Sequence, residues 1–189
     1  VAAGRQALAA DLAERIPEAL RAFRDALAAD PTRLDALAGW VTALASQPWE
    51  SIPPEDLTAA HELLQWARER NPERPELVAA YARILLAVPG EKNRAEALSV
   101  AWKAGALAPR DPDARLALGL SRLHDDPMGA VRVLDAELDR PGFDRRLLTA
   151  AARARWAAGD VDRRRVPRLL RVPRLLPHPR RAPAASAWT

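Results

Sequence analysis

Apolar residues recur along most of this chain at the spacing of one face of an α-helix. Ala19, Phe23 and Ala26 fall on the same side of a helix together with the leucines beside them. The same spacing recurs in three later segments, which span residues 57–67, 98–105 and 130–138. Only 5% of the residues are aromatic and strand-favouring residues are sparse, whereas alanine, leucine and arginine dominate. The pattern therefore predicts an all-α protein.

Prolines divide this apolar pattern into segments. Twelve of the seventeen prolines lie before residue 160. A proline inside a helix costs about 3 kcal/mol and is tolerated mainly in the first turn or between helices. The segments between the prolines predict nine helices, over residues 2–14, 17–29, 33–46, 55–70, 75–88, 92–107, 112–124, 127–139 and 144–158. These form four pairs and a single helix.

Several polar residues stand where such helices would begin. Asp111 and Asp126 each come directly before a proline, so each places a side-chain acceptor at the N-cap and a proline at the first helical position. Thr32 with Asp35 has the spacing of a capping box. Gly90 follows a proline, and this pair predicts a turn between two helices.

One set of four positions occurs in three of the predicted helices. It consists of a small residue, a larger apolar residue four positions later, a second small residue seven positions later and a proline twelve positions later. The three sets are Ala19, Phe23, Ala26 and Pro31; Ala60, Leu64, Ala67 and Pro72; and Ala97, Ala101, Ala104 and Pro109. Two small residues on one face allow a helix to approach its neighbour closely at two levels. The recurrence indicates an internal repeat.

The repeated set resembles the second helix of the tetratricopeptide repeat (TPR), a family of helix-turn-helix units about 34 residues long. The first helix of that unit usually carries a Leu-Gly pair, which Leu118 and Gly119 match. The two earlier units lack the glycine. The successive units are 41, 37 and 33 residues apart, and in the fourth Glu137 stands where the second small residue belongs.

The resemblance covers residues 1 to about 160 and implies an α-solenoid of stacked antiparallel helix pairs that forms a right-handed superhelix. In such an array no unit buries its apolar face alone, and about three or more units are needed for a stable core. Residues 1–160 are therefore expected to form the repeat domain. The remaining residues, 161–189, form a separate tail.

The resemblance also implies where a partner would bind. In this family the first helix of each pair lines a concave groove, and the second lies on the convex side. The groove positions carried over to this sequence are Ala38, Thr42, Ala79, Arg83, Leu116 and Leu120. The Lys and Asn clamp with which some members hold a C-terminal carboxylate is not present. The expected partner is a protein or peptide, bound as an extended segment or an amphipathic helix through apolar anchors.

Some of these residues have a second interpretation. For Leu116 and Leu120, packing in the core is an equally good interpretation. Arg83 is the clearest candidate for contact with a partner, but a solvated surface position is the preferred interpretation for it. Trp66, Trp102 and Trp156 fall on or beside apolar stripes, which favours burial in the core. Trp49 lies in the inserted loop around residues 47–54, where it would serve as an interface anchor or as a lid on the array.

The sequence contains no pattern that specifies a reaction. His61, His124 and His178 are far apart, and there is no cysteine and no phosphate-binding glycine loop. We therefore expect a protein that is not an enzyme and that needs no cofactor and no metal. No stretch approaches the roughly 18 apolar residues of a membrane-spanning helix. The expected location is cytoplasmic, with an exported or periplasmic protein as the alternative, and the oligomeric state stays open.

The last thirty residues differ from the rest of the chain. They contain eight arginines against Asp160 and Asp162, five prolines, and the hexamer RVPRLL twice in tandem. This composition predicts a disordered or irregular tail over residues 161–189. The tail could bind phosphates, but aromatic residues for base stacking are lacking apart from Trp188, so nucleic acid is not the expected partner. An altered terminus that truncates the fifth unit is the preferred account.

Three functional hypotheses follow. The leading one is a scaffold that binds a partner peptide or helix in the concave groove. The first alternative is a regulatory nucleic-acid-binding protein that uses the basic tail. The second is an accessory module of a larger enzyme whose catalytic part lies outside this chain.

Overall fold

The computed structural model describes residues 1–10, 13–138 and 144–159, and these residues form helices and turns without any strand. The prediction of an all-α protein is confirmed for this part of the chain. The predicted tail, residues 161–189, lies outside it. The helices are α1 (Ala2–Ala9), α2 (Ile16–Ala29), α3 (Leu34–Leu44), α4 (Pro54–Arg70), α5 (Pro75–Ala87), α6 (Glu91–Leu107), α7 (Pro112–Arg122), α8 (Pro127–Leu138) and α9 (Arg145–Ala157), with short 3₁₀ helices η1 (Ala13–Arg15) and η2 (Trp49–Ser51).

The predicted ends of the helices from α2 to α9 agree with the structure to within two residues. The prediction of a continuous first helix over residues 2–14 is wrong, because α1 ends at Ala9 and η1 follows it. Since α1 and α2 pack against each other, the chain has to turn between them, and Pro17 lies in the first turn of α2. None of the described helices is both long enough and apolar enough to cross a membrane.

Two of the predicted N-caps are confirmed. The side chain of Asp111 accepts a hydrogen bond from the backbone N–H of Ala114 at 2.9 Å, and that of Asp126 accepts one from Gly129 at 2.8 Å. Each bond satisfies one of the backbone donors that a helix leaves free at its start. The predicted turn at Gly90 is also present, with φ 147° directly before α6, a backbone conformation that favours glycine.

The predicted capping box of Thr32 and Asp35 is wrong. The N-cap of α3 is Arg33, and its side chain makes no capping bond. The backbone N–H and the hydroxyl of Thr32 both donate to Oδ1 of Asp30, at 3.0 and 2.6 Å. These bonds hold the turn that follows α2, and they lower the pKa of Asp30. Thr32 therefore stabilises the turn after α2 and does not cap the start of α3.

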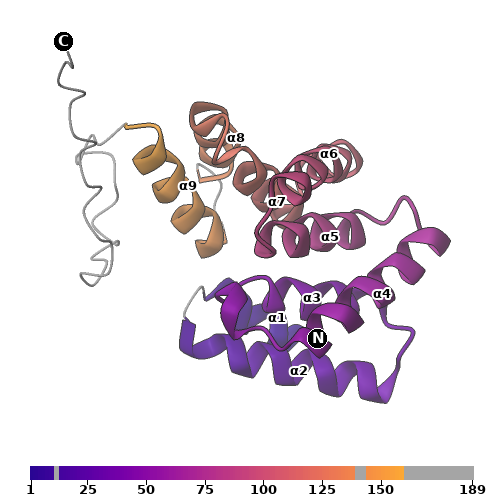
Figure 1. The fold of residues 1–189 in the computed structure, drawn as a ribbon. Coiled ribbons are helices and arrows are strands. Elements are labelled where there is room, and N and C mark those ends of the chain that lie inside the picture. The colour runs from indigo at the N-terminus through magenta and orange to yellow at the C-terminus, as the bar shows by residue number, and fades with distance from the viewer. Residues whose placement is uncertain (11–12, 139–143, 160–189) are drawn as a thin grey trace, which may run out of the picture.

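The odd-numbered helices contact one another in order along the chain. Contacts join α1 to α3, α3 to α5, α5 to α7 and α7 to α9, while α4, α6 and α8 each pack against the odd-numbered helices before and after them. The first and last described helices, α1 and α9, also touch. Figure 1 shows α1 to α4 grouped below α5 to α9, with α3 and α5 at the junction. The odd-numbered helices therefore form one continuous layer.

The repeated small residues lie at the contacts between these helices. Ala60, Leu64 and Ala67 of α4 are completely buried, as are the three alanines at the same positions of α6. In the fourth unit Glu137 occupies the second small position and is also buried, with Oε1 3.3 Å from Nε of Arg115. The residues that repeat in the sequence are therefore the residues that are buried between the helices.

The prediction that Trp66, Trp102 and Trp156 belong to the core is wrong, because these side chains are 44%, 52% and 48% exposed. The alanines beside them bring the helices too close together for an indole ring to fit between. Two of the three rings are instead covered by guanidinium groups. Arg70 lies 4.6 Å from the ring of Trp66, and Arg122 lies 5.4 Å from that of Trp102.

Candidate functional site

A cavity of about 880 Å³ opens on the layer of odd-numbered helices. Its wall comes from the loop after α3, from α5, α7 and α9, from the loop after α7, and from one residue each of α6 and α8. Four of the residues predicted to bind a partner line it, namely Trp49, Arg83, Leu116 and Leu120. Residues from five helices, α5 to α9, thus meet around one space.

The floor of this cavity is partly apolar. Leu116 is only 2% exposed and packs in the core shared by α7, α8 and α9. Leu120, one turn further along α7, is half-buried against the same core and also faces the cavity. The interpretation of these leucines as core residues is confirmed, and each of them also borders the cavity. Their contact with a partner stays a prediction.

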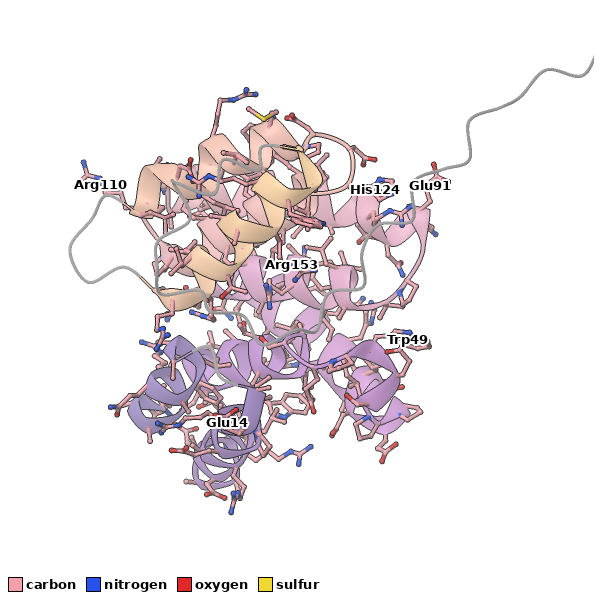
Figure 2. The ribbon with its side chains drawn as sticks, turned by 90° about the vertical axis from the view of Figure 1, so that its left-hand side faces the viewer. Glu14, Trp49, Glu91, Arg110, His124 and Arg153 are labelled. Carbon is pink, nitrogen blue, oxygen red and sulfur yellow. The ribbon has the colours of Figure 1, made fainter. Side chains whose placement is uncertain are left out.

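The charged residues that line the cavity are all cationic or histidine. They are Arg83, Arg94, His124, Arg146 and Arg153, and no aspartate or glutamate lines it among the described residues. Figure 2 shows Arg153 near the middle of the molecule and His124 towards one edge. Because guanidinium groups stay charged at any physiological pH, the cavity carries a positive potential.

Arg83 is a buried member of this group. Its residue is 8% exposed, so the interpretation of a solvated surface arginine is wrong. Nη2 of Arg83 donates to the hydroxyl of Ser46 at 3.2 Å, and that hydroxyl donates to the carbonyl oxygen of Thr42 at 2.8 Å. This chain of bonds ties α5 to the C-terminal end of α3 and holds the guanidinium in place at the cavity wall.

Arg94 of α6 and Arg153 of α9 differ from the other arginines of the cavity. Arg94 is half-buried and Arg153 is exposed. Neither side chain makes a hydrogen bond or an ion pair with another residue in the described part of the chain. His124 stands apart at the rim, where Nδ1 lies 2.6 Å from Oδ1 of Asp125 and the imidazole is 67% exposed. Arg94 and Arg153 are thus the cationic groups of the cavity most open to an anion.

A second, smaller cavity of about 350 Å³ lies at the N-terminal ends of the same helices. Ala38 and Thr42, both predicted to bind a partner, line this cavity and not the larger one. Its carboxylates come from the first turns and caps of α3, α5, α7 and α9, where a negative charge complements the helix dipole. They are Asp35, Glu76, Asp111, Asp113 and Asp144.

The carboxylates of the smaller cavity have partners within the protein. Asp35 lies 3.4 Å from Arg33, Glu76 lies 2.8 Å from Arg74, and the cap Asp111 accepts from the backbone. Among the described residues no three acidic or histidine side chains are arranged to hold a metal ion. The carboxylates of the smaller cavity are therefore already bound at the N-termini of helices, and few polar groups there are free to bind a ligand.

Arg146 lies between the two cavities and lines both. Its side chain is 10% exposed, and Nη2 lies 2.9 Å from Oδ1 of Asp113 in α7 and also pairs with Asp144, the N-cap of α9. Burial by itself would lower the pKa of this guanidinium, but the two adjacent carboxylates outweigh burial and raise the pKa above its usual value. Arg146 is therefore a fixed charge that joins α7 to α9.

One predicted contact residue is corrected by the structure. Ala79 has no exposed surface and packs in the core between α5, α6 and α7, so it cannot touch a partner. Two cavity residues, Arg94 and Arg153, were missed. The family groove positions were carried over only to the first helices of complete repeats, which leaves out both α6 and the single helix α9. A signal was present for Arg153, which has no acidic residue three or four positions away on its predicted helix, but not for Arg94, which has Glu91 three positions before it.

Comparison with known proteins identified no relative of this chain. No family model, no curated protein and no solved structure matches the chain.

Proposed function

We propose that this chain is a scaffold of the TPR type, a right-handed α-solenoid that binds a segment of a partner protein against its layer of odd-numbered helices. Three features support the proposal. Small residues recur at one spacing in α2, α4 and α6 and are buried where the helices meet, apart from half-buried Ala26. Each odd-numbered helix contacts the next one, as the first helices of stacked repeats do. The exposed side chains of Trp66 and Trp102, on α4 and α6, do not line the larger cavity.

The observation that carries the proposal is the cavity of about 880 Å³ on that layer. Ligand sites in proteins commonly measure about 300–1,000 Å³ and combine apolar walls with a few placed polar groups. This cavity has such a composition, with Leu116 and Leu120 beside Arg83 and Ser46. Because its wall is built from packed helices, a ligand would not have to order it, which favours affinity. No carboxylate of the described residues lines it, and this composition supports binding more than acid-base catalysis.

The test is selection of peptides on the immobilised full chain from a displayed random library, followed by affinity measurements on variants. Leu120→Ser removes an apolar anchor from the cavity. We expect it to lower the affinity of the selected peptides roughly tenfold, which corresponds to about 1.4 kcal/mol of binding free energy. Met128→Ser is the matched control, because Met128 is 47% exposed on α8 and does not line the cavity. Equal affinities for the wild type and the Leu120 variant would contradict the proposal.

A further inference from the structure

We propose that the partner segment is an acidic amphipathic peptide, whose carboxylates meet Arg94 and Arg153 while its apolar side chains pack against Leu116 and Leu120. This inference rests on the proposed function and specifies the kind of partner that the larger cavity takes. The ligand group is the side-chain carboxylate and not the C-terminus of the partner.

The first argument is the imbalance of charge in the larger cavity. Elsewhere in the described part of the chain many arginines face a carboxylate at short distance, as Arg24 faces Asp56 and Arg155 faces Asp135, each at 2.6 Å. In the larger cavity no carboxylate is among the lining residues, and Arg94 and Arg153 have no partner in the described part of the chain. Like charges gathered in a concave space focus a positive potential that an anion would relieve.

The second argument concerns Arg146 at the boundary of the two cavities. Its Nη1 atom is buried and has no hydrogen-bond partner among the described residues, although its other nitrogens pair with Asp113 and Asp144. Because Asp113 and Asp144 neutralise its charge, Arg146 contributes to the larger cavity, which it also lines, an unsatisfied N–H donor and no net positive charge. The positive charge of this cavity that remains open to an anion is therefore that of Arg94 and Arg153.

The third argument distinguishes a peptide from a nucleic acid. Single-stranded nucleic acids bind along grooves where successive bases stack on aromatic rings. The larger cavity has one aromatic ring besides His124, that of Trp49. Its remaining wall includes Leu86, Leu116 and Leu120, which suit the aliphatic side chains of a peptide. The mixture of leucines and arginines thus fits a peptide that carries both aliphatic and acidic side chains.

The experiment measures fluorescence anisotropy of a labelled peptide on the full chain. The probe is acetyl-Glu-Glu-Leu-Leu-Glu-Glu-amide, whose blocked ends exclude binding through a terminal carboxylate. Two matched probes replace every Glu by Gln or by Lys. We expect the acidic probe to bind at least roughly tenfold more tightly than either, with an affinity that falls as salt is added.

The residues are tested by charge reversal. In the double variant Arg94→Glu and Arg153→Glu we expect the acidic probe to lose at least roughly tenfold in affinity, since attraction is replaced by repulsion at two positions. The control is Arg110→Glu with Arg132→Glu, which changes the net charge equally at two exposed arginines that do not line the cavity. Figure 2 shows Arg110 at the edge of the molecule opposite His124 and Trp49. Thermal unfolding checks that both double variants fold. If the variant with Arg94→Glu and Arg153→Glu does not fold, the variant with Arg94→Gln and Arg153→Gln replaces it.

The control also accounts for the eight arginines that follow residue 160, which would attract any anion. Equal losses in both double variants would mean unspecific attraction and would overturn the inference. The Gln probe could bind as tightly as the Glu probe and lose affinity in the Leu120→Ser variant. This result would support peptide binding in the larger cavity and would overturn its preference for acidic peptides. Failure of all three probes to bind overturns the inference, while peptide selection tests the groove separately. Tighter binding of a single-stranded oligothymidylate, lost in the Arg94 and Arg153 variant, would also overturn it.

Discussion

The ring of Phe23 lies against Gly39 so closely that a Cβ atom on Gly39 would stand 2.2 Å from Cε1 of the ring. A Cβ atom on Gly4 would stand 2.8 Å from Cζ of the same ring. Phe23 itself is completely buried. One aromatic ring of α2 is therefore enclosed by two glycines, one from α1 and one from α3, and the three helices meet around it.

Gly39→Ala is expected to destabilise the protein by about 1–3 kcal/mol, because the added methyl group would overlap the buried ring of Phe23, which would have to shift. Equilibrium unfolding in urea measures the change.

The matched control is Gly105→Ala in α6. A Cβ atom there would lie 3.5 Å from Cδ2 of Leu118, which is an ordinary contact. Because glycine inside a helix is less favourable than alanine, this substitution is expected to raise the free energy of unfolding by up to about 1 kcal/mol. Similar effects of the two substitutions would show that the close packing of Phe23 is not as described.

The two kinds of tryptophan should respond differently to truncation. Trp40 is 5% exposed, and Trp40→Ala is expected to cost about 3–5 kcal/mol because it leaves a large cavity in the core. Trp102 is 52% exposed and contacts Arg122, so Trp102→Ala should cost about 0.5–1 kcal/mol. Thermal unfolding of both variants checks the difference, and a large loss for Trp102 would indicate that this ring is buried in solution.

Arg146→Met tests the charge that joins α7 to α9. Removing the guanidinium leaves Asp113 and Asp144 without their buried partner, and loss of one member of a buried ion pair typically costs about 3–5 kcal/mol. Arg145→Met changes the same charge at the exposed neighbouring position and should alter the free energy of unfolding by less than about 0.5 kcal/mol. Equal unfolding midpoints for the two variants would argue against the bridge.

Asp111 should make the stability of the protein depend on pH in an unusual direction. Burial raises the pKa of its carboxyl above the usual value, and the hydrogen bond from Ala114 offsets only part of this effect. Since the pKa is higher in the folded state than in the unfolded state, ionisation of Asp111 disfavours folding. Its contribution to stability therefore increases as the pH falls through the folded pKa.

Asp111→Asn keeps a good N-cap acceptor and removes the ionisation. We expect it to be at least as stable as the wild type at neutral pH, with an advantage that shrinks as the pH falls below the folded pKa. Asp111→Ala also loses the cap and should cost about 1 kcal/mol at neutral pH. Urea unfolding at neutral and acidic pH measures both, and an advantage of the Asn variant that grows in acid would contradict the assignment.

The helices could be predicted from the sequence because prolines and apolar spacing act locally. The repeated small residues also identified which face of α4 and α6 is buried. The sites of the three exposed tryptophans could not be predicted in this way. An indole at the edge of an apolar stripe turns inward or outward according to the distance to the next helix, and that distance is set by alanines on both helices.

The candidate site was predictable only in part, for a related reason. Leu116, Leu120 and Arg83 lie on α5 and α7 at groove positions that the family resemblance supplied, and they line the larger cavity. Arg94 and Arg153 line it from α6 and α9, because of the way in which these helices pack against their neighbours. Such packing depends on many small contacts between helices, and no short motif specifies it.

The most direct test of the account is to map a selected peptide onto the protein by NMR. Amide and methyl shifts of the labelled full chain, titrated with that peptide, would show which helices it contacts. We expect the largest changes along the larger cavity, at Ser46, Arg83, Leu120 and Arg153. Changes centred instead on Trp66 of α4 and Trp102 of α6 would contradict the claim that the layer of odd-numbered helices is the binding face.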